Sequence, residues 1–231
     1  IFKAERIDKD LLRKFQEEIE VMVRLKHEHI VKFIGMVWEE PTLAICLEFV
    51  EGGTLSAALK ADREVGSAST ELTSWAPHKL RIACGVADAL AYLHGLAPRV
   101  IHRDIKSENI LLTARALVPK LADFGEAREM DDERMATMTQ VGTPYYLAPE
   151  IARGDRYDQQ CDVYSLGVVM LEMGDRQGLR SAFNEMAGMQ LVGAIVDGWR
   201  PELPSTAVGE EASSLIRECM RSQPRERPSA A

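Results

Sequence analysis

Residues 100–112 read V-I-H-R-D-I-K-S-E-N-I-L-L, a run in which a cluster of polar side chains is enclosed by apolar segments. Because buried chain on both sides must turn these side chains outward together, we expect them to line one cleft. The run therefore predicts a polar functional loop held in place by buried chain. The cluster consists of His102, Arg103, Asp104, Lys106 and Asn109.

Two further motifs follow this loop at fixed distances. Asp123-Phe124-Gly125 begins fourteen residues after Asn109, and Ala148-Pro149-Glu150 begins twenty-five residues after Asp123. A lone Asp-Phe-Gly has little significance, but three motifs in this order are specific. Together they resemble the eukaryotic protein kinase family, and the resemblance covers essentially the whole chain.

The chemistry of that family accounts for the residue types in the loop. The resemblance implies that Asp104 orients the acceptor hydroxyl and takes its proton, while Lys106 neutralises the γ-phosphate of ATP. It implies that Asn109 and Asp123 hold Mg²⁺, because their oxygen atoms are the hard ligands that this ion prefers. The predicted cofactors are thus ATP and Mg²⁺. A solvated, salt-bridged turn would explain Asp104 and Lys106 alone, but not the ordered motifs.

An amphipathic helix is expected near the N-terminus, over residues 6–25. Glu18 falls within its apolar stripe, whose members follow one another at spacings of 4, 3, 4 and 3. A carboxylate on such a face needs a cationic partner. In the kinase family a strand lysine binds the α- and β-phosphates and pairs with a helix glutamate, so the resemblance assigns this ATP-binding pair to Lys3 and Glu18, fifteen residues apart. The stripe consists of Leu11, Phe15, Glu18, Met22 and Leu25.

Residues 43–55, L-A-I-C-L-E-F-V-E-G-G-T-L, resemble the hinge that binds the adenine ring in kinases. By that resemblance Leu47 is the gatekeeper, the main chain of Glu48 and Val50 faces the base, and Leu111 lies beneath it. These residues are also ordinary strand and core residues, because a hinge uses backbone groups rather than side-chain chemistry.

Several further residues match structural positions of the family. Asp162 matches the helix aspartate that braces the catalytic loop, and Arg227 matches the arginine that pairs with Glu150 of the activation segment. We expect His102 to be a packed core histidine rather than an acid–base group. It belongs to a predicted packed column that consists of Met22, Phe33, His102 and Phe124.

The predicted fold class is α+β, a bilobal protein kinase-like fold within one catalytic domain. Residues 1–51 form an incomplete small lobe, rich in β-structure, with one helix and two β-rich runs at residues 30–38 and 43–49. Residues 52–231 form a larger, mainly helical lobe. Within it, residues 163–173 are apolar on nearly every face, which indicates a buried helix.

The composition of the chain argues against some classes of binding partner. The 28 Lys and Arg against 36 Asp and Glu give a net charge of −8, which disfavours a nucleic acid or an anionic membrane. Four cysteines without a Cys-x-x-Cys pair favour reduced thiols and a cytoplasmic protein. The apolar runs fall far short of the ~20 residues of a membrane span.

Lys106 and Gly142-Thr143-Pro144 resemble the serine/threonine members of the family, so protein substrates with Ser or Thr acceptors are the predicted partners. Two segments, H-E-H-I-V-K-F-I-G and C-D-V-Y-S-L-G-V-V-M-L-E-M, look most like the tyrosine-kinase-like group, which includes Raf-like and mixed-lineage-like kinases. The function implied is transfer of the γ-phosphate of ATP to Ser or Thr hydroxyls in intracellular signalling.

Arg103, directly before Asp104, suggests control by phosphorylation, because a docked phosphate would compensate a cation beside the catalytic base. We expect Thr137 or Thr139 to be the site, modified by an upstream kinase or by autophosphorylation; ordinary loop threonines are the alternative. Glu126 stands where many kinases carry an apolar residue.

Two expectations concern what the chain lacks. No G-x-G-x-x-G occurs, so the family's phosphate-covering strands are expected before Ile1, and residues 1–231 alone are expected to be weakly active or inactive. A pseudokinase or nucleotide-binding scaffold is the alternative function. His27-x-His29 resembles a metal pair only superficially, and we expect it at a turn between helix and strand.

Overall fold

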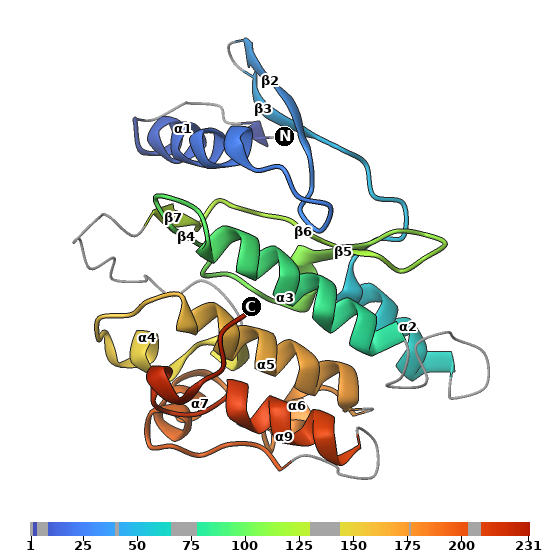
Figure 1. Cartoon of the computed structure of the whole chain (residues 1–231), viewed down its shortest axis with the longest axis vertical. Helices are drawn as coiled ribbons and strands as arrows, with labels where there is room; N and C mark the ends of the chain where they lie inside the picture. Colours follow the sequence, from blue (N-terminus) through green and yellow to red (C-terminus); the bar gives the residue numbers. More distant parts are fainter. Residues whose placement is uncertain are drawn as a thin grey trace.

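The computed structural model describes residues 2–3, 9–39, 42–65, 78–129, 144–175, 177–202 and 209–231. Figure 1 shows a small unit of strands with one helix beside a larger, mainly helical unit. The predicted α+β, bilobal kinase-like class is confirmed by this arrangement.

The small unit is built from one sheet and one helix. Its strands are β1 (Phe2–Lys3), β2 (Phe33–Glu39) and β3 (Thr42–Leu47), which form an antiparallel sheet in the order β1-β3-β2. Helix α1 (Lys9–Arg24) packs against this sheet, where the rings of Phe15 and Trp38 meet edge to face with centroids 6.1 Å apart. Burial of its apolar stripe, including Phe15 and Met22, holds α1 in place.

The larger unit contains short strand pairs and the remaining helices. Strand β4 pairs with β7, and β5 pairs with β6, both antiparallel. These strands are β4 (Val100–Ile101), β5 (Ile110–Leu112), β6 (Pro119–Leu121) and β7 (Arg128–Glu129). The helices are α2 (Leu55–Val65), α3 (Leu80–His94), α4 (Pro149–Arg153), α5 (Gln160–Gly174), α6 (Leu179–Ala182), α7 (Gly188–Val196) and α9 (Glu210–Cys219), with 3₁₀ turns η2 (Ser107–Asn109), η3 (Pro144–Tyr146) and η4 (Pro224–Glu226).

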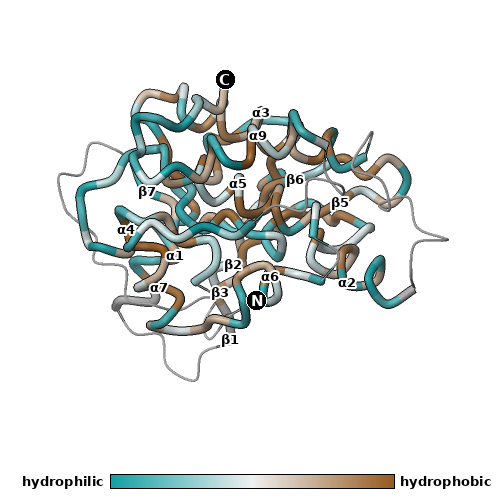
Figure 2. Tube along the Cα trace, turned by 90° about the horizontal axis from the view of Figure 1, so that it is seen from below, coloured by the Kyte–Doolittle hydropathy of each residue, from teal (hydrophilic) through white to brown (hydrophobic). Residues whose placement is uncertain are grey.

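Helix α5 forms the centre of the core. Every residue from Cys161 to Gly174 is buried, as expected for a helix that is apolar on nearly all faces. Figure 1 shows α5 between α3 and α9, and Figure 2 shows it at the middle of the molecule. Each fully buried apolar side chain here, such as Tyr164 or Val168, contributes roughly 1.5–3 kcal/mol of transfer free energy. The helix is therefore a rigid base for the loops that touch it.

Backbone hydrogen bonds join the two units where the segment between α1 and β2 lies beside β6. The amide of Val31 donates to the carbonyl of Leu121 at 2.9 Å, and the amide of Leu121 donates to the carbonyl of His29 at 2.8 Å. The segment that leads from α1 into β2 is thus fixed to β6. Within the described residues, no helix has both the length and the apolar character needed to span a bilayer.

Candidate active site

The loop of residues 102–109 is held by one buried carboxylate on α5. Asp162 is fully buried; its Oδ1 accepts the amide of Arg103 at 2.8 Å and its Oδ2 accepts the amide of His102 at 3.0 Å. Nε2 of His94 lies 2.9 Å from the same Oδ2. Arg103 has a φ of 67°, a backbone conformation that non-glycine residues seldom adopt. Asp162 therefore offsets backbone strain in the loop that carries Asp104.

Three of the predicted catalytic residues meet directly. Nζ of Lys106 lies 2.5 Å from Oδ2 of Asp104, and Nδ2 of Asn109 donates to the same oxygen at 2.8 Å and to the Asp104 carbonyl at 2.9 Å. Because the Asn109 amide nitrogen is engaged in this way, its amide oxygen is the atom left to bind a cation. The loop thus presents an oriented carboxylate beside a cation and an oxygen ligand.

Asp123 is joined to this loop through the backbone. The amide of Ala122 donates to the Asn109 carbonyl at 2.9 Å, and Asp123 has a φ of 64°. Its Oδ1 accepts the amide of Gly125 at 3.4 Å. The hydrogen bond from Ala122 places the backbone of Asn109 next to the residue that precedes Asp123. The two predicted metal ligands therefore lie on neighbouring segments of the chain. Their carboxylate and amide oxygens fit the hard, oxygen-rich donor set that Mg²⁺ requires.

A second carboxylate approaches Asp123 from helix α1. A Cβ atom placed on Gly125 would lie 3.4 Å from Oδ1 of Asp123 and 3.8 Å from Oε2 of Glu18. Burial, and then the negative charge of Asp123, raise the pKa of Glu18 above its ordinary value. Both carboxylates thus lie beside Gly125, and their mutual repulsion favours positive charge at this place. Lys3 lies in β1, opposite Thr42 of β3, but its side chain and its predicted contact with Glu18 lie outside the described residues.

Arg103 is buried, and its guanidinium makes three contacts with two residues. Its Nε donates to the Glu126 carbonyl at 2.6 Å, Nη1 donates to the Tyr157 hydroxyl at 2.8 Å, and Nη2 lies 3.7 Å from Oε2 of Glu126. The expectation of an uncompensated cation is therefore wrong for the described arrangement, because Glu126 and Tyr157 already satisfy the guanidinium. The predicted activation-segment residues Thr137, Thr139 and Thr143 lie outside the described residues.

The predicted hinge connects the sheet to α2. Leu47 ends β3 and is half-buried, and the Glu48 amide donates to the Lys32 carbonyl at 2.9 Å. Among the hydrogen bonds of the described residues, none engages the Glu48 carbonyl or the Val50 amide. These are backbone groups that an adenine ring could use.

Two contacts hold the hinge and the strand beneath it. In the hinge, the Glu48 carboxylate accepts hydrogen bonds from the Lys120 side chain and from the Lys32 amide. These bonds lower the pKa of Glu48, although burial opposes its ionisation. Leu111, half-buried in β5, forms a bridge with Thr54. A Cβ on Gly52 would lie 2.3 Å from the Leu112 carbonyl oxygen, so only glycine permits this close approach.

His102 belongs to the core, as its sequence context predicts. Its ring meets Phe124 edge to face with centroids 4.9 Å apart, and Met22 is also buried while Phe33 is partly buried. Nδ1 accepts the Asp104 amide at 3.3 Å and Nε2 donates to the Ala122 carbonyl at 3.2 Å. Burial lowers the pKa of His102, so it is neutral and serves as a structural link between the loop and Ala122.

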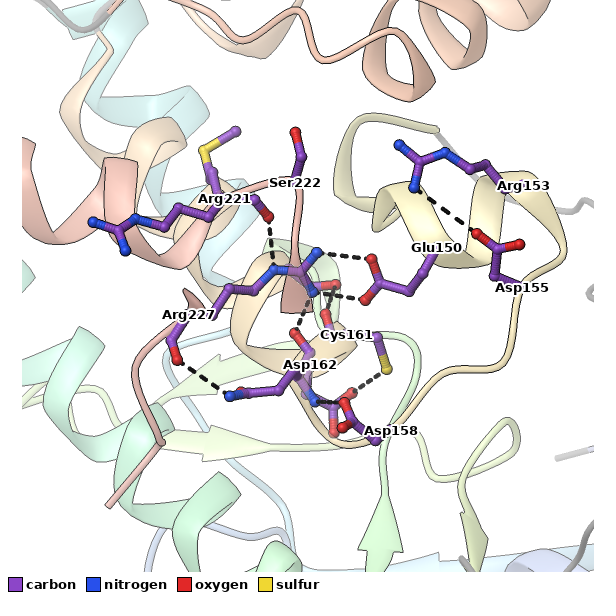
Figure 3. Close-up of polar contacts among 12 residues, drawn as sticks. Glu150, Arg153, Asp155, Asp158, Cys161, Asp162, Arg221, Ser222 and Arg227 are labelled. Atoms are coloured by element: carbon purple, nitrogen blue, oxygen red, sulfur yellow. Dashed lines mark hydrogen bonds and ion pairs between the residues drawn. The ribbon is translucent and has the colours of Figure 1, made fainter. Parts of the chain in front are cut away.

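Glu150 and Arg227 form a buried, two-bonded ion pair (Figure 3). Nη1 and Nη2 of Arg227 lie 2.6 and 2.7 Å from the two carboxylate oxygens, and the side chains are 0% and 4% exposed. Arg227 also donates to the carbonyls of Gln160 and Arg221, at 2.8 and 2.9 Å. Its guanidinium lies 5.1 Å from the Tyr164 ring centroid. This pair ties the end of the activation segment to α5.

A second buried polar cluster was not predicted. The Tyr146 hydroxyl donates to Oε2 of Glu172 at 2.7 Å and lies 3.2 Å from the Ser107 hydroxyl. Burial raises the pKa of both Tyr146 and Glu172. The cluster links the catalytic loop, residues 144–150 and α5. The available signal was Glu172 itself, an acidic residue within an otherwise apolar helix.

Comparison with known proteins agrees with this geometry. The family model described as protein kinase domain matches residues 1–231. A protein of Acanthamoeba polyphaga mimivirus named as a serine/threonine-protein kinase/receptor is 35% identical over 98% of this chain and 13% of its own length.

Two cellular relatives are similarly close. The serine/threonine-protein kinase drkB of Dictyostelium discoideum is 32% identical over 97% of this chain and 31% of its own length. The serine/threonine-protein kinase SIS8 of Arabidopsis thaliana is 33% identical over 97% of this chain and 21% of its own length. This chain thus spans less than a third of each of these three relatives, and it belongs to the protein kinase domain family.

Proposed function

We propose that this chain is the catalytic domain of an ATP-dependent protein serine/threonine kinase. The observation that carries the proposal is the convergence of Asp104, Lys106 and Asn109 in one loop that is hydrogen-bonded to the segment bearing Asp123. Phosphoryl transfer depends on positioning and charge neutralisation more than on covalent chemistry, and this loop supplies both.

The residues of this site have different roles in phosphoryl transfer. Asp104, whose carboxylate is positioned by Asn109 and Lys106, orients the acceptor hydroxyl and takes its proton as the hydroxyl oxygen bonds to the γ-phosphorus and the bond from that phosphorus to the leaving ADP breaks. Lys106 lies beside this carboxylate, where its charge stabilises the transferring phosphoryl group. Asn109 and Asp123 would hold Mg²⁺, which when bound neutralises phosphate charge.

The acceptor class and the subgroup are part of this proposal. The relatives are named as serine/threonine kinases, and Lys106 and Gly142-Thr143-Pro144 support Ser or Thr hydroxyls of protein substrates. The two segments noted above support the tyrosine-kinase-like group. Four free thiols, two of them exposed, support a reducing, cytoplasmic location.

Phosphorylation of Thr137 or Thr139 is a further part of the proposal. Because Arg103 already contacts Glu126 and Tyr157, an incoming phosphate would have to compete with these contacts rather than fill an empty site. Modification by an upstream kinase or by autophosphorylation would then replace some of the contacts that Arg103 makes with Glu126 and Tyr157.

Activity is tested with the full-length protein that carries this domain, γ-labelled ATP and a generic basic protein. We expect label on serine and threonine after acid hydrolysis, dependent on Mg²⁺, and strongly reduced in Asp123→Asn. Asp155→Asn, which changes an exposed carboxylate just after α4, is the matched control. Nucleotide binding without transfer by the wild-type protein would contradict the proposal and favour the scaffold alternative.

A further inference from the structure

A second group of ligand-type side chains lies outside the catalytic loop, where the segment after α1 meets α3. Ligand atoms of Glu28, His29 and Asp88 all lie within 4.8 Å of one another. Glu28 and His29 come from the turn that leads into β2, whereas Asp88 comes from the middle of α3. The phosphoryl-transfer chemistry proposed above uses none of these three residues.

His29 is oriented with one nitrogen available. Its Nδ1 lies 2.9 Å from the Pro119 carbonyl oxygen, which can only accept, so Nδ1 carries the proton and Nε2 keeps its lone pair. The ring is fixed by close packing, because a Cβ on Gly85 would lie 2.9 Å from its Cε1 atom. A histidine whose second nitrogen bonds a backbone carbonyl is the usual arrangement of a metal ligand.

His27 positions Asp88 rather than acting as a ligand. Its Nδ1 accepts the amide of His29 at 3.2 Å, so in the neutral ring Nε2 carries the proton and faces Oδ2 of Asp88 at 3.4 Å. The ring stacks on Tyr92 with centroids 4.9 Å apart, which holds it in place. Asp88 is more than half exposed, so its other carboxylate oxygen is open to solvent.

The charges at this place also favour a cation. Glu28 and Asp88 bring two carboxylates together, and the nearby ammonium of Lys120 is already bonded to Glu48 at 2.8 Å. The same ammonium donates to the backbone carbonyl of Glu28 at 3.0 Å and not to its carboxylate. Within the described part of the chain, no cation is paired with the Glu28 carboxylate.

We propose that Glu28, His29 and Asp88 form a site for Zn²⁺, with water completing the coordination. One imidazole with two carboxylates suits a borderline ion such as Zn²⁺, whereas Mg²⁺ and Ca²⁺ prefer oxygen ligands throughout. Ligand atoms around a tetrahedral Zn²⁺ lie about 3.3 Å apart, so the exposed carboxylates move inward on binding. A bound ion would connect the segment entering β2 to α3.

The test measures Zn²⁺ binding to the full-length protein that carries this domain by calorimetric titration in millimolar Mg²⁺. The background carries Cys46→Ser and Cys84→Ser, because these two thiols are exposed and could bind zinc themselves. We expect saturable binding of one equivalent and a rise in melting temperature with added Zn²⁺. Removal of outer-shell partners of metal ligands typically costs about 10- to 100-fold in affinity, so His29→Gln and Asp88→Asn should lose at least tenfold.

Two controls separate the site from general effects. Glu64→Gln, an exposed carboxylate on α2, should leave the affinity for Zn²⁺ unchanged. The metal-free melting temperature of each variant shows whether it folds. His27→Gln, which removes the ring that contacts Asp88, the His29 amide and Tyr92 but removes no ligand, should weaken binding without abolishing it. Absence of saturable binding in the wild-type background, or equal affinity in His29→Gln, would overturn the proposal.

Discussion

Two of the places where arginine pairs with glutamate in this structure differ in how deeply the pair is buried. Glu150 and Arg227 form a two-bonded pair that is almost wholly excluded from water. Two pairs connect helix α1 to β7: Arg24 with Glu129, which is exposed, and Arg128 with Glu17, which is half-buried and spans 3.4 Å. Exposed pairs contribute roughly 0.2–1 kcal/mol, whereas breaking a buried pair costs about 3–5 kcal/mol.

This difference indicates which part of the active site is rigid. The catalytic loop and residues 144–150 rest on α5 through buried contacts of Asp162, Glu172 and Arg227. Helix α1 carries Glu18 toward Asp123, and its ion pairs to β7 are exposed or half-buried. We infer that these ion pairs hold α1 much less firmly than its buried apolar stripe does, and less firmly than the buried polar contacts hold the loop of residues 102–109.

The buried pair gives the largest expected loss of stability. Arg227→Met leaves Glu150 buried and uncompensated, so the free energy of unfolding should fall by about 3–5 kcal/mol. Denaturant unfolding followed by circular dichroism measures the change. Arg225→Met, an exposed neighbour, should change stability by less than about 0.5 kcal/mol. Equal effects of the two substitutions would show that burial of the pair does not matter.

Asp162→Asn should come next. The asparagine keeps the size of the side chain, but one oxygen becomes an NH₂ group that faces backbone amides, so about 1–3 kcal/mol should be lost. Because the loop carrying Asp104 depends on these bonds, phosphoryl transfer should fall as well. Unfolding and transfer assays on the same preparation separate the two effects, and an unchanged transfer rate would argue against the bracing role.

The dependence of unfolding free energy on pH should also differ between the region around α5, which carries Glu172, and helix α1, which carries Glu18. Burial raises the pKa of Glu172 above 4.5, so its stabilising contribution is complete below that pH and is lost as pH rises through the folded-state pKa. Glu172→Gln should therefore gain stability relative to wild type between pH 4.5 and 7. Glu18→Gln on α1 should show the same sign with a smaller slope, because Glu18 is less buried.

Urea unfolding at a series of pH values provides this measurement. Other carboxylates titrate equally in wild type and variant, so their contributions cancel in the difference. A relative stability of Glu172→Gln that stays flat or falls with rising pH would contradict the assignment.

The exposed pair of Arg24 and Glu129 gives the smallest effect. A double-mutant cycle with Arg24→Ala and Glu129→Ala should yield a coupling free energy of roughly 0.2–1 kcal/mol, reduced further in 1 M NaCl. A coupling above about 3 kcal/mol that is insensitive to salt would mean that α1 is held as firmly as the catalytic loop.

Sequence reasoning was strongest where the signal is local. The order and spacing of the motifs around Asp104, Asp123 and Glu150 predicted the family, the fold class and a loop whose polar residues meet. The buried helix was predictable because residues 163–173 are apolar on nearly every face. In both cases the residues that determine the structure lie within a short stretch of sequence.

Contacts between distant residues were not predictable in the same way. Arg103 binds Tyr157, fifty-four residues later, and Tyr146 binds Glu172, twenty-six residues later. The sequence around Arg103 or Tyr146 does not indicate which distant residue each will bind. These hydrogen bonds depend on how whole helices and loops pack together. The pairing of Lys3 with Glu18 and the phosphorylation of Thr137 or Thr139 stay predictions.

The central claim is that Asp104 is the catalytic carboxylate of a protein kinase, and a single rate comparison tests it most directly. Phosphate transfer from Mg-ATP to a basic protein is measured for the full-length protein and for Asp104→Asn, with Asp155→Asn as the matched surface control. General-base catalysis contributes about 10²- to 10⁴-fold, so Asp104→Asn should lose that factor in kcat while retaining ATP binding, and the control should match wild type. A transfer rate for Asp104→Asn equal to that of the control would contradict the claim.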